Sequence, residues 1–301
     1  MAGLSTMNNN SVHIPVRSIS LPSRLHPNSL KIEAGLTRLK SASSLNPLGV
    51  ETLQTGLTRL AELFICIDEL THSPQTQQSL HHHHLNQVED VLDGSIGLID
   101  VCSTARDMFL TMQEHIQDLQ SALRRRGKDS SIESNVQAYV SFRKRARKDI
   151  ANSIRTLKRL EKKTVSSPTS YEEHHSSYLI KVMKEVHAIA IGLFQSVMLF
   201  LSLPITKTST GGWPLISKLI RSGFLGSDKD QKIFNEVGRV DIALFSILGQ
   251  IRKENARFDV QEMQERLKTL AASTQGIEAK LDCVFRCLIQ NRVSLLNLVT
   301  P

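Results

Sequence analysis

Hydrophobic side chains near the C-terminus recur at alternating steps of three and four residues over five heptads. No proline falls between Ala256 and Val299, and the pattern runs through Gly276 without a change of phase. Such steps keep side chains on one stripe of an α-helix, where two helices can interlock. The pattern predicts one helix of roughly 60 Å, from a rise of 1.5 Å per residue. The stripe consists of Val260, Met263, Leu267, Leu270, Thr274, Ile277, Leu281, Val284, Leu288, Asn291 and Leu295.

The same periodicity predicts further helices, and no segment shows the strict alternation of a half-buried strand. We expect helices at about Leu53–Leu70, Leu85–Gly127, Ser130–Leu160, Tyr178–Leu203 and Lys229–Lys253. The most apolar of them, Tyr178–Leu203, is expected in the middle of the molecule. The predicted fold class is therefore all-α, a bundle of long antiparallel helices with a disordered N-terminal arm.

Prolines and glycines divide the chain into segments. Residues 1–29 contain three prolines and no hydrophobic periodicity, so we expect a disordered basic arm rich in serine. Residues 30–301 are expected to form a single elongated helical-bundle domain, beginning with a short amphipathic turn at 30–39. An irregular connector is expected at about 204–230, where two prolines and four glycines interrupt the helical pattern.

The composition, together with the lack of a recognisable secretory signal peptide, predicts an intracellular, cytoplasmic protein. The content of 40% hydrophobic and 5% aromatic residues favours aliphatic helix packing in a soluble protein. The four cysteines lie within apolar helical patterns, and we expect buried, reduced thiols. Two alternatives remain open. Residues 1–32 lack acids, as plastid transit peptides do, and Val186–Leu203 carries no full charge and is marginally long enough for a membrane span.

The net charge of +8 arises in one segment. Between Arg124 and Lys163, fourteen basic residues face four acidic ones, a net charge of +10, so the remainder of the chain carries −2. Most of these basic residues are expected on the outer side of a helix, as one extended ridge. The ridge residues are Arg124, Arg125, Arg126, Lys128, Arg143, Lys144, Arg147, Lys148, Arg155, Lys158, Arg159, Lys162 and Lys163.

Three interpretations of this ridge stay open: a surface for an acidic protein, a surface for anionic lipid, or a solvated helix face. Nucleic acid is not expected, because only Tyr139 and Phe142 lie nearby as aromatic residues for stacking on bases.

A second candidate site lies in the arm. Arg17, Ser18, Ser20 and Pro22 fit the arginine-serine-x-phosphoserine-x-proline pattern that 14-3-3-type adaptors bind. Phosphate on Ser20 would supply the charge that an arginine cluster recognises.

No catalytic, cofactor-binding or metal-ligating residues are predicted. The chain contains no GxSxG, HExxH, GxxxxGK[ST] or GxGxxG motif. The histidine run at 81–84 has no second ligand pair at metal spacing, so we expect an exposed loop there.

Three segments stand in order along the chain: Val16–Pro27; Val88–Ser95 with Leu98–Cys102 and Ala105–Asp107; and Phe285–Asn297. They resemble the signatures of a plant-specific family of unknown biochemical function that includes the BYPASS-type developmental proteins. The resemblance implies an intracellular plant protein tied to root and shoot development, with no activity, cofactor or catalytic residue to carry over.

From these patterns we expect a non-enzymatic helical adaptor or regulatory protein whose ridge faces an acidic partner. The alternatives are a peripheral or single-span membrane protein that binds anionic lipid, and an enzyme of unrecognised type acting on a small signalling molecule. The C-terminal stripe is expected to close either inside the chain or in a homo-oligomer. Arg286 and Arg292 are expected to pair with Asp100 or Asp107 across the bundle.

Overall fold

The computed structural model describes residues 27–42, 49–74, 76–77, 85–125, 129–165, 178–202, 235–251 and 259–299. Its elements are α1 (Pro27–Ala42), α2 (Val50–Thr71), α4 (Leu85–Arg124), α5 (Asp129–Val165), α6 (Tyr178–Ser202), α8 (Glu236–Ile251) and α9 (Val260–Val299). All of these elements are helices, and the long ones are antiparallel, so the predicted all-α bundle is confirmed for the described residues.

Several helix ends differ from the predicted ends for local reasons. Helix α1 begins at Pro27, inside the segment expected to be a disordered arm, because proline suits the first turn of a helix. Helix α9 begins at Val260, where the Asp259 carboxylate accepts hydrogen bonds from the backbone N–H groups of Gln261 and Glu262. Residues 1–26 of the arm and the connector expected at 204–230 lie outside the described residues.

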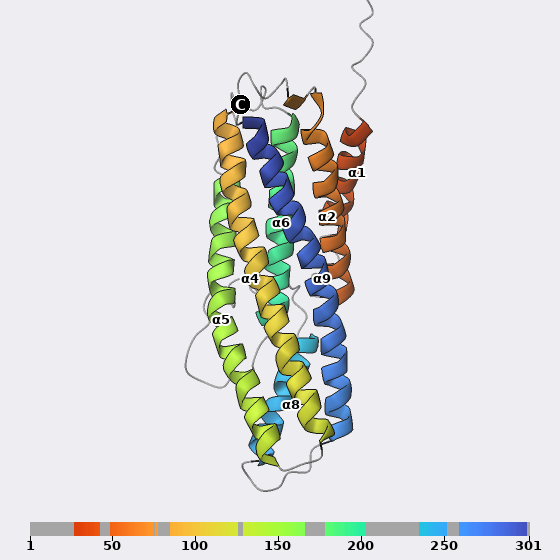
Figure 1. Cartoon of the computed structure of the whole chain (residues 1–301), viewed down its shortest axis with the longest axis vertical. Helices are drawn as coiled ribbons and strands as arrows, with labels where there is room; N and C mark the ends of the chain where they lie inside the picture. The colour runs from red at the N-terminus through yellow and green to blue at the C-terminus, as the bar shows by residue number, and fades with distance from the viewer. Residues whose placement is uncertain are drawn as a thin grey trace, which may run out of the picture.

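Successive helices run in opposite directions along the long axis of the molecule, except that α8 continues in the direction of α6 (Figure 1). Helix α6 contacts α1, α2, α4 and α5, which agrees with the central position predicted from its apolar sequence. Helix α8 lies below α6 in Figure 1 and contacts α5 and α9. Together α6 and α8 occupy the length of bundle that α4, α5 and α9 each cover as one helix.

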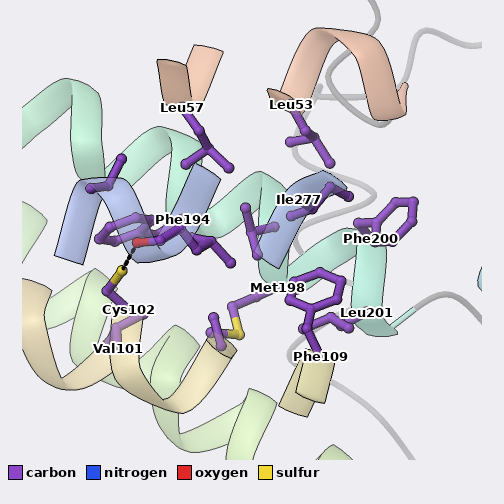
Figure 2. Packing of buried hydrophobic residues seen from close by; sticks show 14 of the residues in the cluster. Leu53, Leu57, Val101, Cys102, Phe109, Phe194, Met198, Phe200, Leu201 and Ile277 are labelled. Atoms are coloured by element: carbon purple, nitrogen blue, oxygen red, sulfur yellow. Dashed lines mark hydrogen bonds between the residues drawn. The ribbon is translucent and has the colours of Figure 1, made fainter. Parts of the chain in front are cut away.

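The core is aliphatic with a few phenylalanines, as the composition predicts (Figure 2). Leu57 of α2, Phe109 of α4 and Phe194 of α6 are fully buried. The thiol of Cys102 donates to the carbonyl oxygen of Leu281 at 3.5 Å, and burial raises its pKa to about 12. Four buried thiols were expected, but only Cys102 is buried. Cys66 and Cys287 are half-buried, and Cys283 is exposed.

The stripe on α9 is closed inside the chain. Apart from Val260, its side chains are buried, and α9 packs against α2, α4 and α8. Asn291 on this stripe donates from Nδ2 to the carbonyl oxygen of Phe64 in α2 at 2.9 Å. Oligomerisation through this stripe would require the bundle to open.

Candidate functional site

Five basic side chains of α5 lie along one side of the helix and are exposed. They are separated by four, seven, four and three residues, which keeps them on one stripe. Among the described residues, Lys144, Lys148 and Arg159 form no ion pair with a carboxylate. We call Lys144, Lys148, Arg155, Arg159 and Lys162 the basic stripe.

The other predicted ridge residues of α5 are placed differently. Arg147 and Lys158 are half-buried at the edges of the stripe. Lys163 turns toward α4, where its Nζ lies 3.1 Å from Asp90 Oδ1 and 3.4 Å from Asp93 Oδ2. The Lys163 ammonium therefore forms ion pairs between α5 and α4.

The single extended ridge predicted from the sequence divides into two groups. Arg124 and Arg125 are exposed at the end of α4. Lys144 follows the start of α5 by fifteen residues, or about 22 Å of helix, without an exposed basic side chain in between. Arg126 and Lys128 lie outside the described residues.

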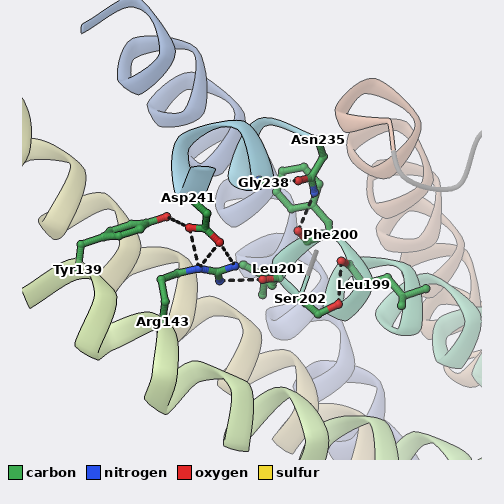
Figure 3. Close-up of polar contacts among 9 residues, drawn as sticks. All are labelled: Tyr139, Arg143, Leu199, Phe200, Leu201, Ser202, Asn235, Gly238 and Asp241. Atoms are coloured by element: carbon green, nitrogen blue, oxygen red, sulfur yellow. Dashed lines mark hydrogen bonds and ion pairs between the residues drawn. The ribbon is translucent and has the colours of Figure 1, made fainter. Parts of the chain in front are cut away.

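Arg143 is buried, and its assignment to the exposed ridge is wrong. It lies about 100° around the helix from Lys144 and therefore points toward α6 and α8. Its Nε donates to both oxygens of the Asp241 carboxylate at 3.1 Å, and its Nη2 donates to Oδ2 at 2.9 Å (Figure 3). Its Nη1 donates to the carbonyl oxygen of Leu201 at 2.7 Å, and Tyr139 Oη donates to Asp241 Oδ1 at 2.8 Å. We call Tyr139, Arg143 and Asp241 the buried cluster.

The charges of the buried cluster are fixed by their surroundings. Burial, the largest single influence, disfavours the cationic form of Arg143. The charge of Asp241, the neighbouring Tyr139 and the hydrogen bonding to Asp241 together outweigh it and raise the pKa of the guanidinium. Burial, followed by the charge of Asp241, raises the pKa of Tyr139 well above its usual range. Arg143 therefore stays a cation and Tyr139 a neutral phenol. Because these donors are satisfied within the protein, the cluster suits a structural link between α5, α6 and α8.

Asn235 joins α6 and α8 beside the buried cluster. Its Oδ1 accepts a hydrogen bond from the backbone N–H of Gly238 at 3.0 Å, as an N-cap of α8 does. Its Nδ2 donates to the carbonyl oxygen of Phe200 at 2.7 Å (Figure 3). The last carbonyls of a helix lack partners within the helix. Asn235 and Arg143 supply partners for two of them at the end of α6.

The outer side of α4 carries acidic residues that no recognised motif pointed to. Asp93, Asp100, Asp107 and Glu114 recur every seven residues and are all exposed. A spacing of seven residues keeps them on one side of the helix. We call these four residues the acidic stripe. Its periodicity was readable in the sequence, but its place beside the basic stripe depends on how α4 and α5 pack.

The cross-bundle ion pairs predicted for Arg286 and Arg292 are wrong. Arg286 is exposed and pairs with Asp282 of its own helix. Arg292 Nη1 donates to the carbonyl oxygen of Leu92 at 2.5 Å and to Ser95 Oγ at 3.1 Å. The ion pair between α4 and α9 is made by Arg106, whose Nη2 lies 2.6 Å from Asp282 Oδ1. Residues 106 and 107 point about 100° apart, which leaves Asp107 in solvent.

A family model described as Protein BPS1 matches residues 56–298. The chain belongs to the BPS1 family. Neither the curated proteins nor the solved structures yielded a match. The resemblance to a BYPASS-like family is thus confirmed, and membership of the BPS1 family supports a role in plant development.

Two of the BPS1-like segments meet in space. Arg292, in the closing segment, binds Leu92 and Ser95 in the central one. Between them, a Cβ on Gly94 would lie 3.2 Å from Nδ1 of His187 in α6, tighter than most such contacts. The small residues at 94 and 95 therefore let α6 and α9 approach α4.

A cavity of about 50 Å³ lies where α4, α5 and α6 meet, lined by Gly94, Lys163, Lys184 and His187 among others. This volume admits a few water molecules, whereas sites for drug-sized ligands are roughly 300–1,000 Å³. His187 Nε2 is buried without a hydrogen-bond partner among the described residues, and burial lowers the pKa of its imidazole to about 4. In the described part of the chain, no three His, Cys, Asp or Glu side chains are placed to hold a metal ion.

The remaining predictions for this BPS1-family chain concern the 14-3-3-type motif, the histidine run and the alternative of a membrane span. Arg17, Ser18, Ser20 and Pro22 lie outside the described residues, as does the histidine run. Among the described helices, α6 is long and apolar enough to cross a membrane, and half of its most apolar window is buried in the bundle.

Proposed function

We propose that this BPS1-family chain is a non-enzymatic helical adaptor or regulatory protein in root and shoot development. In this proposal, the basic stripe of α5 binds an acidic partner. The observation that carries the proposal is the exposed row of five cations on one helix side. A row of exposed like charges attracts a surface of opposite charge.

The other polar groups support a structural role. The donors of Arg143 are used within the buried cluster, and Asn235 bonds both helices at the junction. The cavity beside His187 is small, at about 50 Å³. These features favour a rigid bundle that presents surfaces over a site that binds and converts a substrate.

The test is affinity capture of tagged protein from root cells, with partners identified by mass spectrometry. The stripe variant combines Lys148→Glu, Arg155→Glu and Arg159→Glu. The control variant reverses three exposed lysines of other helices, Lys31, Lys181 and Lys268, so both variants have the same net charge. We expect acidic partners to be lost from the stripe variant and kept by the control. Equal capture by both variants would contradict the proposal.

An anionic membrane surface is the second candidate for the stripe. The composition of α6 favours it, because this helix also passes the length and hydropathy criteria for a membrane span. Cell fractionation separates the candidates. Soluble protein supports the adaptor, release by salt indicates that charge holds the protein on a surface, and resistance to alkaline carbonate indicates that α6 inserts.

Residues Arg17, Ser18, Ser20 and Pro22 form a second proposed docking element, for a 14-3-3-type adaptor. A synthetic peptide of this segment is expected to bind such an adaptor only when Ser20 is phosphorylated. Equal binding of the unphosphorylated peptide would contradict this part of the proposal.

A further inference from the structure

The stripes of opposite charge on α4 and α5 lie at the same levels along the bundle. Two contacts fix how these antiparallel helices align: Lys163 with Asp90, and the amide of Asn135 with the carbonyl oxygen of Asp118. In both contacts the residue numbers add up to 253. A residue of α4 and a residue of α5 therefore lie at the same height along the bundle when their numbers add up to about 253.

Three acids are thereby level, to within two residues, with three bases. Each set is spaced by seven residues, so the match repeats along about 21 Å of helix. The level pairs are Asp93 with Lys162, Asp100 with Arg155, and Asp107 with Lys148.

Two of these pairs, Asp100 with Arg155 and Asp107 with Lys148, do not close among the described residues. Asp100 and Asp107 form no ion pair with a described residue of α5, whereas Asp93 pairs with Lys163 and is still 61% exposed. Both stripes lie on the solvent side of their helices, and core-facing residues such as Gly97 of α4 and Leu160 of α5 contact each other beneath them. Side by side, they form one face with an acidic half and a basic half.

We propose that this face binds a second copy of the chain, as a twofold dimer whose axis runs parallel to the helices between α4 and α5. The inference rests on the proposed function, since it identifies the acidic partner of the basic stripe as the acidic stripe of another copy. A rotation about this axis places each α4 opposite the other copy's α5 and preserves the levels. A twofold axis across the bundle would place acid against acid.

The same face offers apolar contacts and enough area. Ile96 and Leu110 follow Asp93 and Asp107 by three residues and are 43% and 42% exposed. Two neighbouring helices about 60 Å long and about 10 Å wide present roughly 1,200 Å². A standard stable interface buries about 800 Å² on each partner. Charge pairing would select the partner and its orientation, and the apolar contacts would add affinity.

The experiment measures molar mass by light scattering during size-exclusion chromatography of the full chain. One variant combines Lys148→Glu and Arg155→Glu; the other combines Asp100→Lys and Asp107→Lys. We expect the unchanged chain to have twice the 33.6 kDa of one copy. Each variant alone is expected to be monomeric. In its dimer, α4 of each copy would face α5 of the other copy with charges of the same sign, so both of these contacts would be repulsive. An equimolar mixture is expected to restore the double mass, because both contacts become attractive again. Circular dichroism checks that the variants are folded.

A monomeric unchanged chain, or dimeric variants, would overturn this inference. So would folded variants that are monomeric alone and stay monomeric when mixed. The capture experiment under the proposed function is independent, because a monomer that still loses its acidic partners in the stripe variant leaves that function intact.

Discussion

Arg143 and the basic stripe show opposite uses of the same charge on one helix. Arg143 is buried and binds a carboxylate and a carbonyl oxygen, whereas Lys144, the next residue, is exposed. The difference arises from about 100° of helix rotation, which turns one side chain toward α8 and the next toward solvent. A buried cation must keep its partner, while an exposed cation is free to find one in another molecule.

The largest effect is expected from Asp241→Ala, which leaves the buried Arg143 without its carboxylate. Removing one partner of a buried ion pair costs about 3–5 kcal/mol, so the free energy of unfolding should fall by that amount. Urea denaturation followed by circular dichroism measures it. The double variant Arg143→Met, Asp241→Leu should recover much of the loss. A loss below about 1 kcal/mol for Asp241→Ala would mean that solvent reaches the cluster.

His187 extends the comparison to a buried base whose Nε2 has no hydrogen-bond partner among the described residues. Burial lowers the pKa of its imidazole from 6.5 to about 4. Between these pH values the unfolded chain takes up a proton that the folded chain does not, so stability falls as the pH drops from about 6.5 to about 4. The full loss is about 3 kcal/mol, and it grows no further below that range. In urea denaturation across this range, His187→Gln should lose less stability than the unchanged chain. Parallel curves would contradict the prediction.

Asn235 tests the junction between α6 and α8 with a neutral side chain. Asn235→Ala removes the N-cap of α8 and the partner of the Phe200 carbonyl oxygen, at a cost of about 1–2 kcal/mol. Asn235→Asp keeps the cap but cannot donate to that carbonyl oxygen, so its loss should be intermediate. Thermal denaturation measures both. Equal stability of the two variants would show that only one of the bonds matters.

The smallest effect is expected in the basic stripe. Lys148→Ala and Arg155→Ala should each change the free energy of unfolding by no more than about 0.5 kcal/mol, because exposed positions tolerate substitution. The hydrogen bonds of Arg155 are exposed and stay within its own helix, to Asn152 and to the carbonyl oxygen of Ala151. The same denaturation assay as for Asp241→Ala gives a direct comparison. A loss above about 1 kcal/mol in either would place that side chain in the structural network rather than on a docking surface.

Much of the fold was predictable because it rests on local periodicity. The α9 stripe, the apolar α6 and the break between α4 and α5 each follow from spacing and composition within one segment. The site was less predictable. The basic residues were found by their density in one segment. Arg143 was wrongly placed on the surface, because hydrophobic spacing does not reveal that it pairs with Asp241, a buried acid 98 residues away in the chain.

The sequence by itself determined that the chain forms long helices, which side of α9 is buried, and that positive charge gathers on α5. These properties depend on residues within a few helical turns of one another. Only the tertiary structure decided that the α9 stripe closes inside the chain, that Arg143 pairs with Asp241, and that the acidic stripe of α4 lies level with the basic stripe of α5. These depend on packing between distant segments, which the order of residues along any one helix does not specify.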